Sequence, residues 1–147
     1  MPKKKNMLPA PRNYCFACGK ANPHGMHLRF TFDKARRQIS SSFALGKRYS
    51  GPPGSCHGGI IATILDEAMA KLNGPNQVTA VTAHLAVEYL KPVPLHQPLR
   101  AEAHETRSHG RRRFRQAAIL NSQGLVLAQG KGIFITLDPK KMRGGSV

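Results

Sequence analysis

Acidic side chains are scarce in this chain of 147 residues, since seven Asp and Glu stand against 23 Lys and Arg, for a formal net charge of +16. A surface with that balance attracts polyanions such as nucleic acids, anionic lipids or phosphate-bearing metabolites. The charge does not choose among these partners, but it makes the position of each carboxylate informative. The acidic residues are Asp33, Asp66, Glu67, Glu88, Glu102, Glu105 and Asp138.

Long apolar runs and cysteines are also few. The longest strongly apolar stretch, Ile60–Leu65, has six residues, whereas a membrane-spanning helix needs about 20. Lys3–Lys5 is basic, but no apolar segment of a signal peptide follows it. The three cysteines are too few, and odd in number, for a disulfide framework. We therefore expect a cytoplasmic protein in a reducing compartment, with no membrane partner.

The length suits one domain that can bury a core without disulfides or metals. Residues 1–13 carry four basic residues and three prolines, which predicts a flexible basic arm. Residues 138–147 have the composition of a basic tail. The folded domain is therefore expected over residues 14–137.

Most of that domain alternates apolar and polar residues with a period of two, which predicts strands. The predicted strands are Leu28–Phe32, Ile39–Leu45, Val78–Leu90, a segment beginning at Leu99, Arg112–Leu120 and Leu125–Leu137. Ser50–Ser55 is rich in Gly and Pro and predicts a loop, and Gly59–Leu72 has helical spacing that ends before an Asn-Gly-Pro terminator. One helix must then cover one antiparallel sheet, an α+β architecture.

Two finer expectations concern the later strands. Alternation places four side chains of the third strand on one face, namely Val81, Leu85, Val87 and Tyr89. Gly130 and Gly132 predict a bulge or bend in the last strand.

The predicted helix has an unusual second side. Its broad apolar side consists of Ile60, Ile61, Ile64, Leu65, Ala68, Met69 and Leu72. The opposite side presents Ala62, Thr63, Asp66 and Ala70 instead of the usual charges. Such small residues allow close approach, so Asp66 is expected in a covered cleft, where it acts as a base or nucleophile. The alternative is a solvated helix carboxylate. Glu67 lies four residues before Lys71 and is expected to pair with it.

The residues at the helix entrance suit an oxyanion. Cys56, His57, Gly58 and Gly59 precede the helical spacing, and a helix N-terminus offers unpaired N–H groups and a positive dipole end. Glycine lets a ligand approach these groups closely, so the entrance can polarise a carbonyl. The alternative is an ordinary glycine-rich helix start.

Two segments together carry a family resemblance. One reads His-Gly-Gly-Ile-Ile-Ala-Thr-Ile-Leu-Asp-Glu-Ala-Met from His57, and the other reads Val-Thr-Ala-His-Leu-Ala-Val-Glu-Tyr-Leu-Lys-Pro from Val81. They resemble the hotdog-fold acyl-CoA thioesterase superfamily, in particular its phenylacetate-pathway and 4-hydroxybenzoyl-CoA thioesterase branch. The openings Cys-Phe-Ala-Cys-Gly at Cys15 and Asn-Pro-His-Gly-Met-His-Leu at Asn22 are similar to one subgroup.

This resemblance implies a hotdog fold, with a sheet wrapped around a long central helix and subunits joined edge to edge as a homodimer or a dimer of dimers. By position, Asp66 is implied as the catalytic carboxylate, as general base or nucleophile, with Glu67 open as the alternative. The Gly58 N–H is implied to bind the thioester oxygen, Thr82 to place the nucleophilic water, and His57 to line the site. Some relatives carry an amide side chain six residues before the histidine, where this chain has Gly51.

The substrate's phosphates are expected to bind Arg111, Arg112 and Arg113, which follow a turn, while Gly59 is expected to contact the substrate at the helix start. A solvated basic turn is the alternative.

We expect neither a metal nor an organic cofactor. One alternative is a Cys2His2 zinc site formed by Cys15, Cys18, His24 and His27. The favoured interpretation of this segment is a tight turn with reduced thiols. A Cys56–His57 nucleophile pair is disfavoured, because adjacent side chains usually point apart.

The leading functional prediction is an acyl-CoA thioesterase that releases a free acid and coenzyme A. A non-catalytic acyl-CoA-binding hotdog domain is the alternative, because Gly51 provides no amide. A nucleic-acid-associated domain is less favoured, since aromatics make up only 6% of the chain and no base-reading motif is present.

Overall fold

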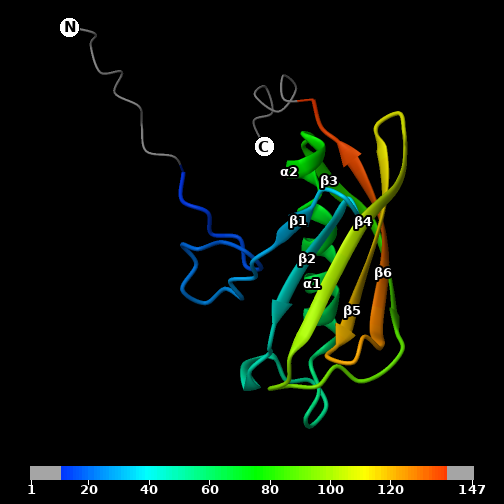
Figure 1. Cartoon of the computed structure of the whole chain (residues 1–147). Helices are drawn as coiled ribbons and strands as arrows, with labels where there is room; N and C mark the ends of the chain where they lie inside the picture. Colours follow the sequence, from blue (N-terminus) through cyan, green and yellow to red (C-terminus); the bar gives the residue numbers. More distant parts are fainter. Residues whose placement is uncertain (1–10, 139–147) are drawn as a thin grey trace, which may run out of the picture.

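An antiparallel sheet of six strands wraps around one long helix (Figure 1). The computed structural model describes residues 11–138. The strands are β1 (Thr31–Asp33), β2 (Gln38–Phe43), β3 (Ala80–Tyr89), β4 (Leu99–His109), β5 (Arg112–Asn121) and β6 (Val126–Thr136), and the helices are α1 (Gly58–Ala70), α2 (Asn73–Asn76) and the 3-10 turn η1 (Lys47–Tyr49). The spatial order is β1-β2-β4-β5-β6-β3, so β3 forms one edge of the sheet. This confirms the predicted α+β hotdog architecture.

Most predicted elements agree with the structure to within two residues, but the first strand does not. The strand expected over Leu28–Phe32 is limited to Thr31–Asp33, because the Leu28 N–H donates to the carbonyl of Ala17 and so belongs to the loop before the sheet. The Asn-Gly-Pro segment is also not a simple terminator. It forms the short helix α2, directly after α1 ends at Ala70.

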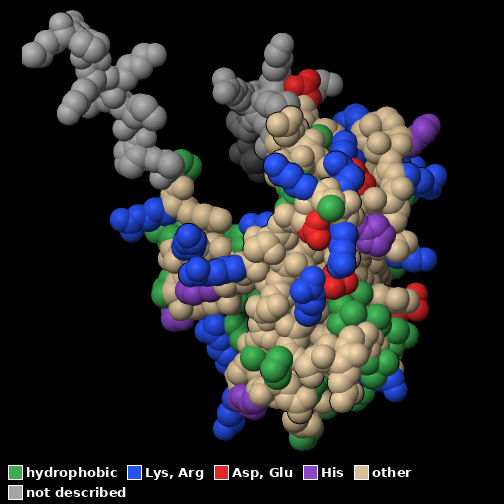
Figure 2. Space-filling view, in the orientation of Figure 1, with side chains coloured by type: hydrophobic (Ala, Val, Ile, Leu, Met, Phe, Trp, Pro, Cys, Tyr) green, Lys and Arg blue, Asp and Glu red, His purple; other side chains and the backbone are tan. Residues whose placement is uncertain are grey.

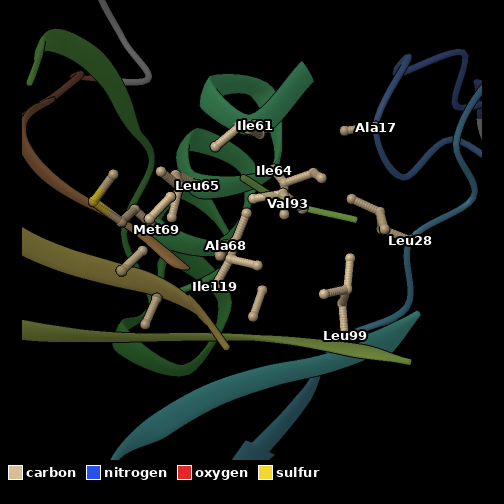
Figure 3. Close-up of a cluster of buried hydrophobic side chains, with 14 of the residues drawn as sticks. Ala17, Leu28, Ile61, Ile64, Leu65, Ala68, Met69, Val93, Leu99 and Ile119 are labelled. Atoms are coloured by element: carbon tan, nitrogen blue, oxygen red, sulfur yellow. The ribbon is translucent and has the colours of Figure 1, made fainter. Parts of the chain in front are cut away.

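The core lies between α1 and the concave face of the sheet. Ile64, Leu65, Ala68 and Met69 are fully buried there, and burial of each large aliphatic side chain contributes about 1.5–3 kcal/mol. A second layer comes from the N-terminal loop, residues 14–28, whose Ala17 and Leu28 point toward the helix in Figure 3.

Gly130 and Gly132 make room for α1 and do not form a bulge. Both pair in regular register with β3 and β5. A Cβ on Gly132 would lie 2.7 Å from the Phe134 ring and 3.1 Å from the Met69 sulfur, so glycine lets the helix approach the sheet. The irregularity in β6 falls instead beside Leu127, which the β5–β6 register skips.

A bulge that alternation did not predict lies in β3, between Thr82 and His84. Thr82 pairs with Phe134 and Leu85 pairs with Gly132, two positions of β6 that share a face. Thr82 therefore faces α1 together with Leu85, and Val81 faces the opposite side. The expectation that Val81 and Leu85 share a face was wrong, because a one-residue insertion reverses the alternation.

No helix of the described residues is long and apolar enough to cross a membrane. The expected basic arm over residues 1–13 and the expected tail over 138–147 lie almost entirely outside the described residues.

Candidate functional site

His57 is the N-cap of α1. Its backbone is extended, with φ −62° and ψ 136°, and its Nδ1 accepts a hydrogen bond from the Gly59 N–H at 2.9 Å. The neutral ring therefore carries its hydrogen on Nε2. The carbonyl of His57 accepts from the N–H groups of Ile60 and Ile61. Within residues 11–138, this leaves the Gly58 N–H without a hydrogen-bond acceptor.

Tyr89 completes the helix entrance, a role that the sequence pattern did not predict. Its hydroxyl, from the end of β3, donates to the Gly58 carbonyl at 2.9 Å. A Cβ on Gly58 would lie 3.5 Å from its ring, an ordinary contact. Tyr89 thus holds the first residue of α1 against the edge strand. It belongs to the Tyr-Leu-Lys-Pro segment of the family resemblance, and this segment was the signal that could have pointed to Tyr89.

The loop before α1 has no space for a side chain at position 51. A Cβ on Gly51 would lie 2.7 Å from the Cα of His57. The loop is closed by hydrogen bonds from the Gly51 N–H to the Ser55 carbonyl and from the His57 N–H to the Tyr49 carbonyl. The absence of an amide here follows from the close approach of these two segments.

Asp66 lies two turns further along α1 and is half-buried. The Thr82 hydroxyl donates to its Oδ1 at 2.6 Å, which links the helix to the edge strand. The β3 bulge creates this contact by turning Thr82 to the helix side. The structure thus brings together two of the predicted residues, and it leaves Thr82 exposed at the open edge.

Glu67 faces the N-terminal loop and not the edge strand. Its Oε2 accepts from the Cys15 thiol at 3.8 Å, and its Oε1 lies 3.6 Å from the Lys71 ammonium. The predicted Glu67–Lys71 pair is confirmed. Burial and the neighbouring Glu67 carboxyl raise the pKa of Cys18 to about 11. The two adjacent acids therefore have separate partners on separate sides of α1.

Asp66 and the Gly58 N–H do not meet within one chain. Eight residues separate them along α1, a rise of about 12 Å at 1.5 Å per residue. One carbonyl group of a ligand cannot contact both groups of the same helix, because its reacting atoms must lie about 3 Å from each.

The predicted phosphate-binding arginines have different surroundings. Arg111 and Arg112 are exposed, and the Nε of Arg111 donates to the Thr136 carbonyl at 3.0 Å. Arg113 is half-buried and forms a bidentate pair with Glu105 at 2.7 and 2.9 Å. Arg113 is thus held in an ion pair of its own chain, whereas Arg111 contacts a backbone carbonyl. Figure 2 shows Lys and Arg side chains over the visible face with few acids among them.

Arg115 is a buried charge that alternation did not identify, with 1% of its surface exposed. Its Nη1 donates to the Met69 carbonyl at 2.9 Å and to the Asn73 side chain at 2.8 Å, and its Nε lies 3.4 Å from Glu105. Burial lowers the pKa of its guanidinium, and Glu105 opposes that effect. Arg115 thereby satisfies a carbonyl at the end of α1.

Cys56 and His57 do not form a nucleophile pair. Cys56 is 4% exposed, its thiol donates to the His57 carbonyl, and burial raises its pKa to about 11. The thiol is thus neutral at physiological pH.

The Cys2His2 ligand set, which was the alternative to the expected absence of a metal, is not assembled. The Nε2 of His27 forms a hydrogen bond with the Asn22 carbonyl at 2.6 Å. The described donors that could surround a metal are Cys15, Cys18 and Glu67.

Along α1 the chain thus presents two separate groups, a carboxylate with a hydroxyl partner at Asp66 and an N–H without an acceptor at Gly58. A carboxylate can activate water or attack a carbonyl, and a free N–H can stabilise the oxyanion that forms. These are the elements of acyl transfer to water.

Comparisons with known proteins identify the family of the chain. The profile of the thioesterase superfamily matches residues 53–128. The acyl-coenzyme A thioesterase THEM4 of Rattus norvegicus is 32% identical over 118 residues, which cover 80% of this chain and 51% of that protein. The chain therefore spans about half the length of the curated relatives it matches.

Solved structures share the fold. The BH2602 protein from Bacillus halodurans, solved with CoA, has a TM-score of 0.65 and 28% identity over 75% of this chain and 74% of that one. The PaaI protein from the E. coli phenylacetic acid degradation operon has a TM-score of 0.65 and 20% identity over 69% of this chain and 73% of that one. This chain belongs to the thioesterase superfamily, which confirms the resemblance of the two quoted segments.

Proposed function

We propose that this protein hydrolyses acyl-CoA thioesters to a free acid and coenzyme A. The observation that carries this proposal is the Asp66–Thr82 pair beside the open edge of the sheet, combined with the unpaired N–H of Gly58. The relatives named acyl-coenzyme A thioesterase and the relative solved with CoA support the same substrate class.

In this mechanism Asp66 removes a proton from a water molecule that attacks the thioester carbonyl. Thr82 holds the carboxylate and the water in place. The oxyanion of the tetrahedral intermediate accepts from the Gly58 N–H, and His57 and Gly59 line the same helix entrance. When the intermediate collapses, the C–S bond breaks, the acid is released, and the thiolate of coenzyme A takes up the proton. Direct attack by Asp66 would instead form an acyl anhydride that water then hydrolyses.

The complete site combines two copies of the chain. At about 1.5 Å per residue, Gly58 and Asp66 lie about 12 Å apart along the helix axis, so a single helix cannot supply both groups to one site. β3 offers an unpaired edge of ten residues that carries Thr82 and Tyr89. Antiparallel pairing of two such edges about a two-fold axis would set Asp66 of one protomer against Gly58 of its partner. We therefore propose a homodimer as the catalytic unit.

The phosphates of coenzyme A would bind exposed cations. Arg111 and Arg112 are available for this role, whereas Arg113 would have to leave Glu105. The net charge of +16 favours approach of the polyanionic substrate.

The test is release of free thiol from short, medium, long and aromatic acyl-CoAs by wild type, Asp66→Asn and Glu67→Gln. We expect Asp66→Asn to lower kcat by about 10²–10⁴-fold and Glu67→Gln to change it far less. Loss of activity only in Glu67→Gln would transfer the catalytic role to that residue. If wild type binds an acyl-CoA saturably but does not hydrolyse it, the protein is a binding domain and not an enzyme.

A further inference from the structure

A thiol-rich cluster lies where the N-terminal loop meets α1 at Glu67. One sulfur each of Cys15 and Cys18 and one carboxylate oxygen of Glu67 lie within 4.8 Å of one another. Tetrahedral zinc, with bonds of about 2.3 Å to sulfur and 2.1 Å to oxygen, places two sulfurs about 3.8 Å apart and a sulfur and an oxygen about 3.6 Å apart. The Cys15 sulfur lies 3.8 Å from the Glu67 Oε2. We propose that these three side chains bind one zinc ion.

The loop that carries both cysteines is shaped around the sulfurs. The Gly19 N–H donates to the Cys15 carbonyl at 2.8 Å, and a Cβ on Gly19 would lie 2.4 Å from the Cys15 nitrogen, so the tight turn requires glycine. The Cys18 N–H donates to the Cys15 sulfur at 3.5 Å, and the Asn13 amide donates to the Cys18 sulfur at 4.0 Å. Hydrogen bonds of this kind stabilise metal-bound thiolates.

Glu67 divides its two oxygens between two partners. Oε2 faces the sulfurs, and Oε1 lies 3.6 Å from the Lys71 ammonium. Lys71 thus orients the carboxylate through Oε1, in the way that a hydrogen-bond or charge partner commonly orients a metal ligand. Two thiolates and one carboxylate carry three negative charges, which Zn²⁺ and Lys71 together neutralise.

A surface hollow adjoins the cluster at Cys18. Cys18 and Lys71 line a hollow of about 820 Å³ whose other walls include Arg12, Lys20 and Arg29. Water or a small anion from this hollow fills the position that three protein ligands leave free. The ion would fasten the N-terminal loop to α1 one residue from Asp66. The proposal does not depend on the proposed hydrolysis, because it rests on residues that the mechanism does not use.

The experiment measures metal in the full-length, untagged protein purified without chelators. We expect one zinc per chain after dialysis, and one Co²⁺ per chain after exchange, with a thiolate-to-cobalt charge-transfer band. Glu67→Gln keeps the shape of the side chain and should weaken Co²⁺ binding by at least about tenfold. The double variant Cys15→Ser/Cys18→Ser should lose the metal and the band. Removal of zinc from wild type should lower Tm.

Two variants serve as controls. Cys56→Ala removes the cysteine outside the cluster and should keep one zinc. His27→Ala should also keep it, whereas loss of zinc in this variant would support the Cys2His2 set instead. The proposal is overturned if wild type holds no more zinc than the double variant. A disulfide between Cys15 and Cys18 in the freshly purified protein would also overturn it.

Discussion

Gly58→Pro removes a single backbone hydrogen from the helix entrance. Gly58 is the first residue of α1, the position where proline is best tolerated, since its N–H has no acceptor in the helix. His57 is already extended at ψ 136°, as a residue before proline prefers. The added Cβ would meet the Tyr89 ring at 3.5 Å, an ordinary contact. The variant therefore tests the donor with little effect on the fold.

The expected effect is a loss of one oxyanion donor, about 10²–10³-fold in kcat, or about 2.7–4 kcal/mol of transition-state stabilisation. Gly58→Ala is the matched control, because it adds the same Cβ and keeps the N–H, and it should retain most activity. The assay is thiol release from the best acyl-CoA, with Tm measured for each variant. A fully active and folded Gly58→Pro protein would refute the assignment of this N–H.

Mixing Gly58→Pro with Asp66→Asn then tests whether two chains form each site. If Asp66 of one protomer acts with Gly58 of its partner, the heterodimer contains one intact site, and random mixing restores about a quarter of wild-type activity. If each chain forms its own site, mixing restores nothing. The subunits must be unfolded and refolded together, with each variant refolded alone as the control.

Three further predictions use other contacts. Thr82→Val removes the donor to Asp66 and should lower kcat about tenfold to a hundredfold with little change in KM, whereas Thr82→Ser should restore it; a constant kcat in both would exclude a positioning role. Arg115→Met should lower the free energy of unfolding in urea by about 3 kcal/mol, because it removes the buried donor to the Met69 carbonyl and the Asn73 side chain together with a cation beside Glu105, while the exposed Arg112→Met should change it by no more than about 0.5 kcal/mol. Burial keeps Cys56 protonated in the folded state, so its contribution to stability should fall as pH rises from about 9 to about 11. This is measured as the difference between wild type and Cys56→Ala, and a pH-independent difference would contradict it.

The helix, the later strands and the helix face that carries Asp66 could all be predicted from the amino-acid sequence. The apolar residues from Ile60 to Leu72 have helical spacing, whereas Leu99, Ala101 and Ala103 alternate with a period of two. Each segment could therefore bury its apolar residues only as a helix or only as a strand. The order of these elements then left one helix to cover one sheet.

The contacts between side chains of the site could not be predicted in this way. A one-residue bulge in β3 turns Thr82 toward Asp66, and alternation had no means to place it. Glu67 has a different partner from its neighbour Asp66, because the N-terminal loop packs against α1 and brings Cys15 to Glu67 from far away in the sequence. Arg115 is buried in an alternating strand because Met69, Asn73 and Glu105 surround it with acceptors. Periodicity predicts the face of the helix or strand on which a residue lies. The contact partners of its side chain depend on long-range packing, which no local sequence pattern contains.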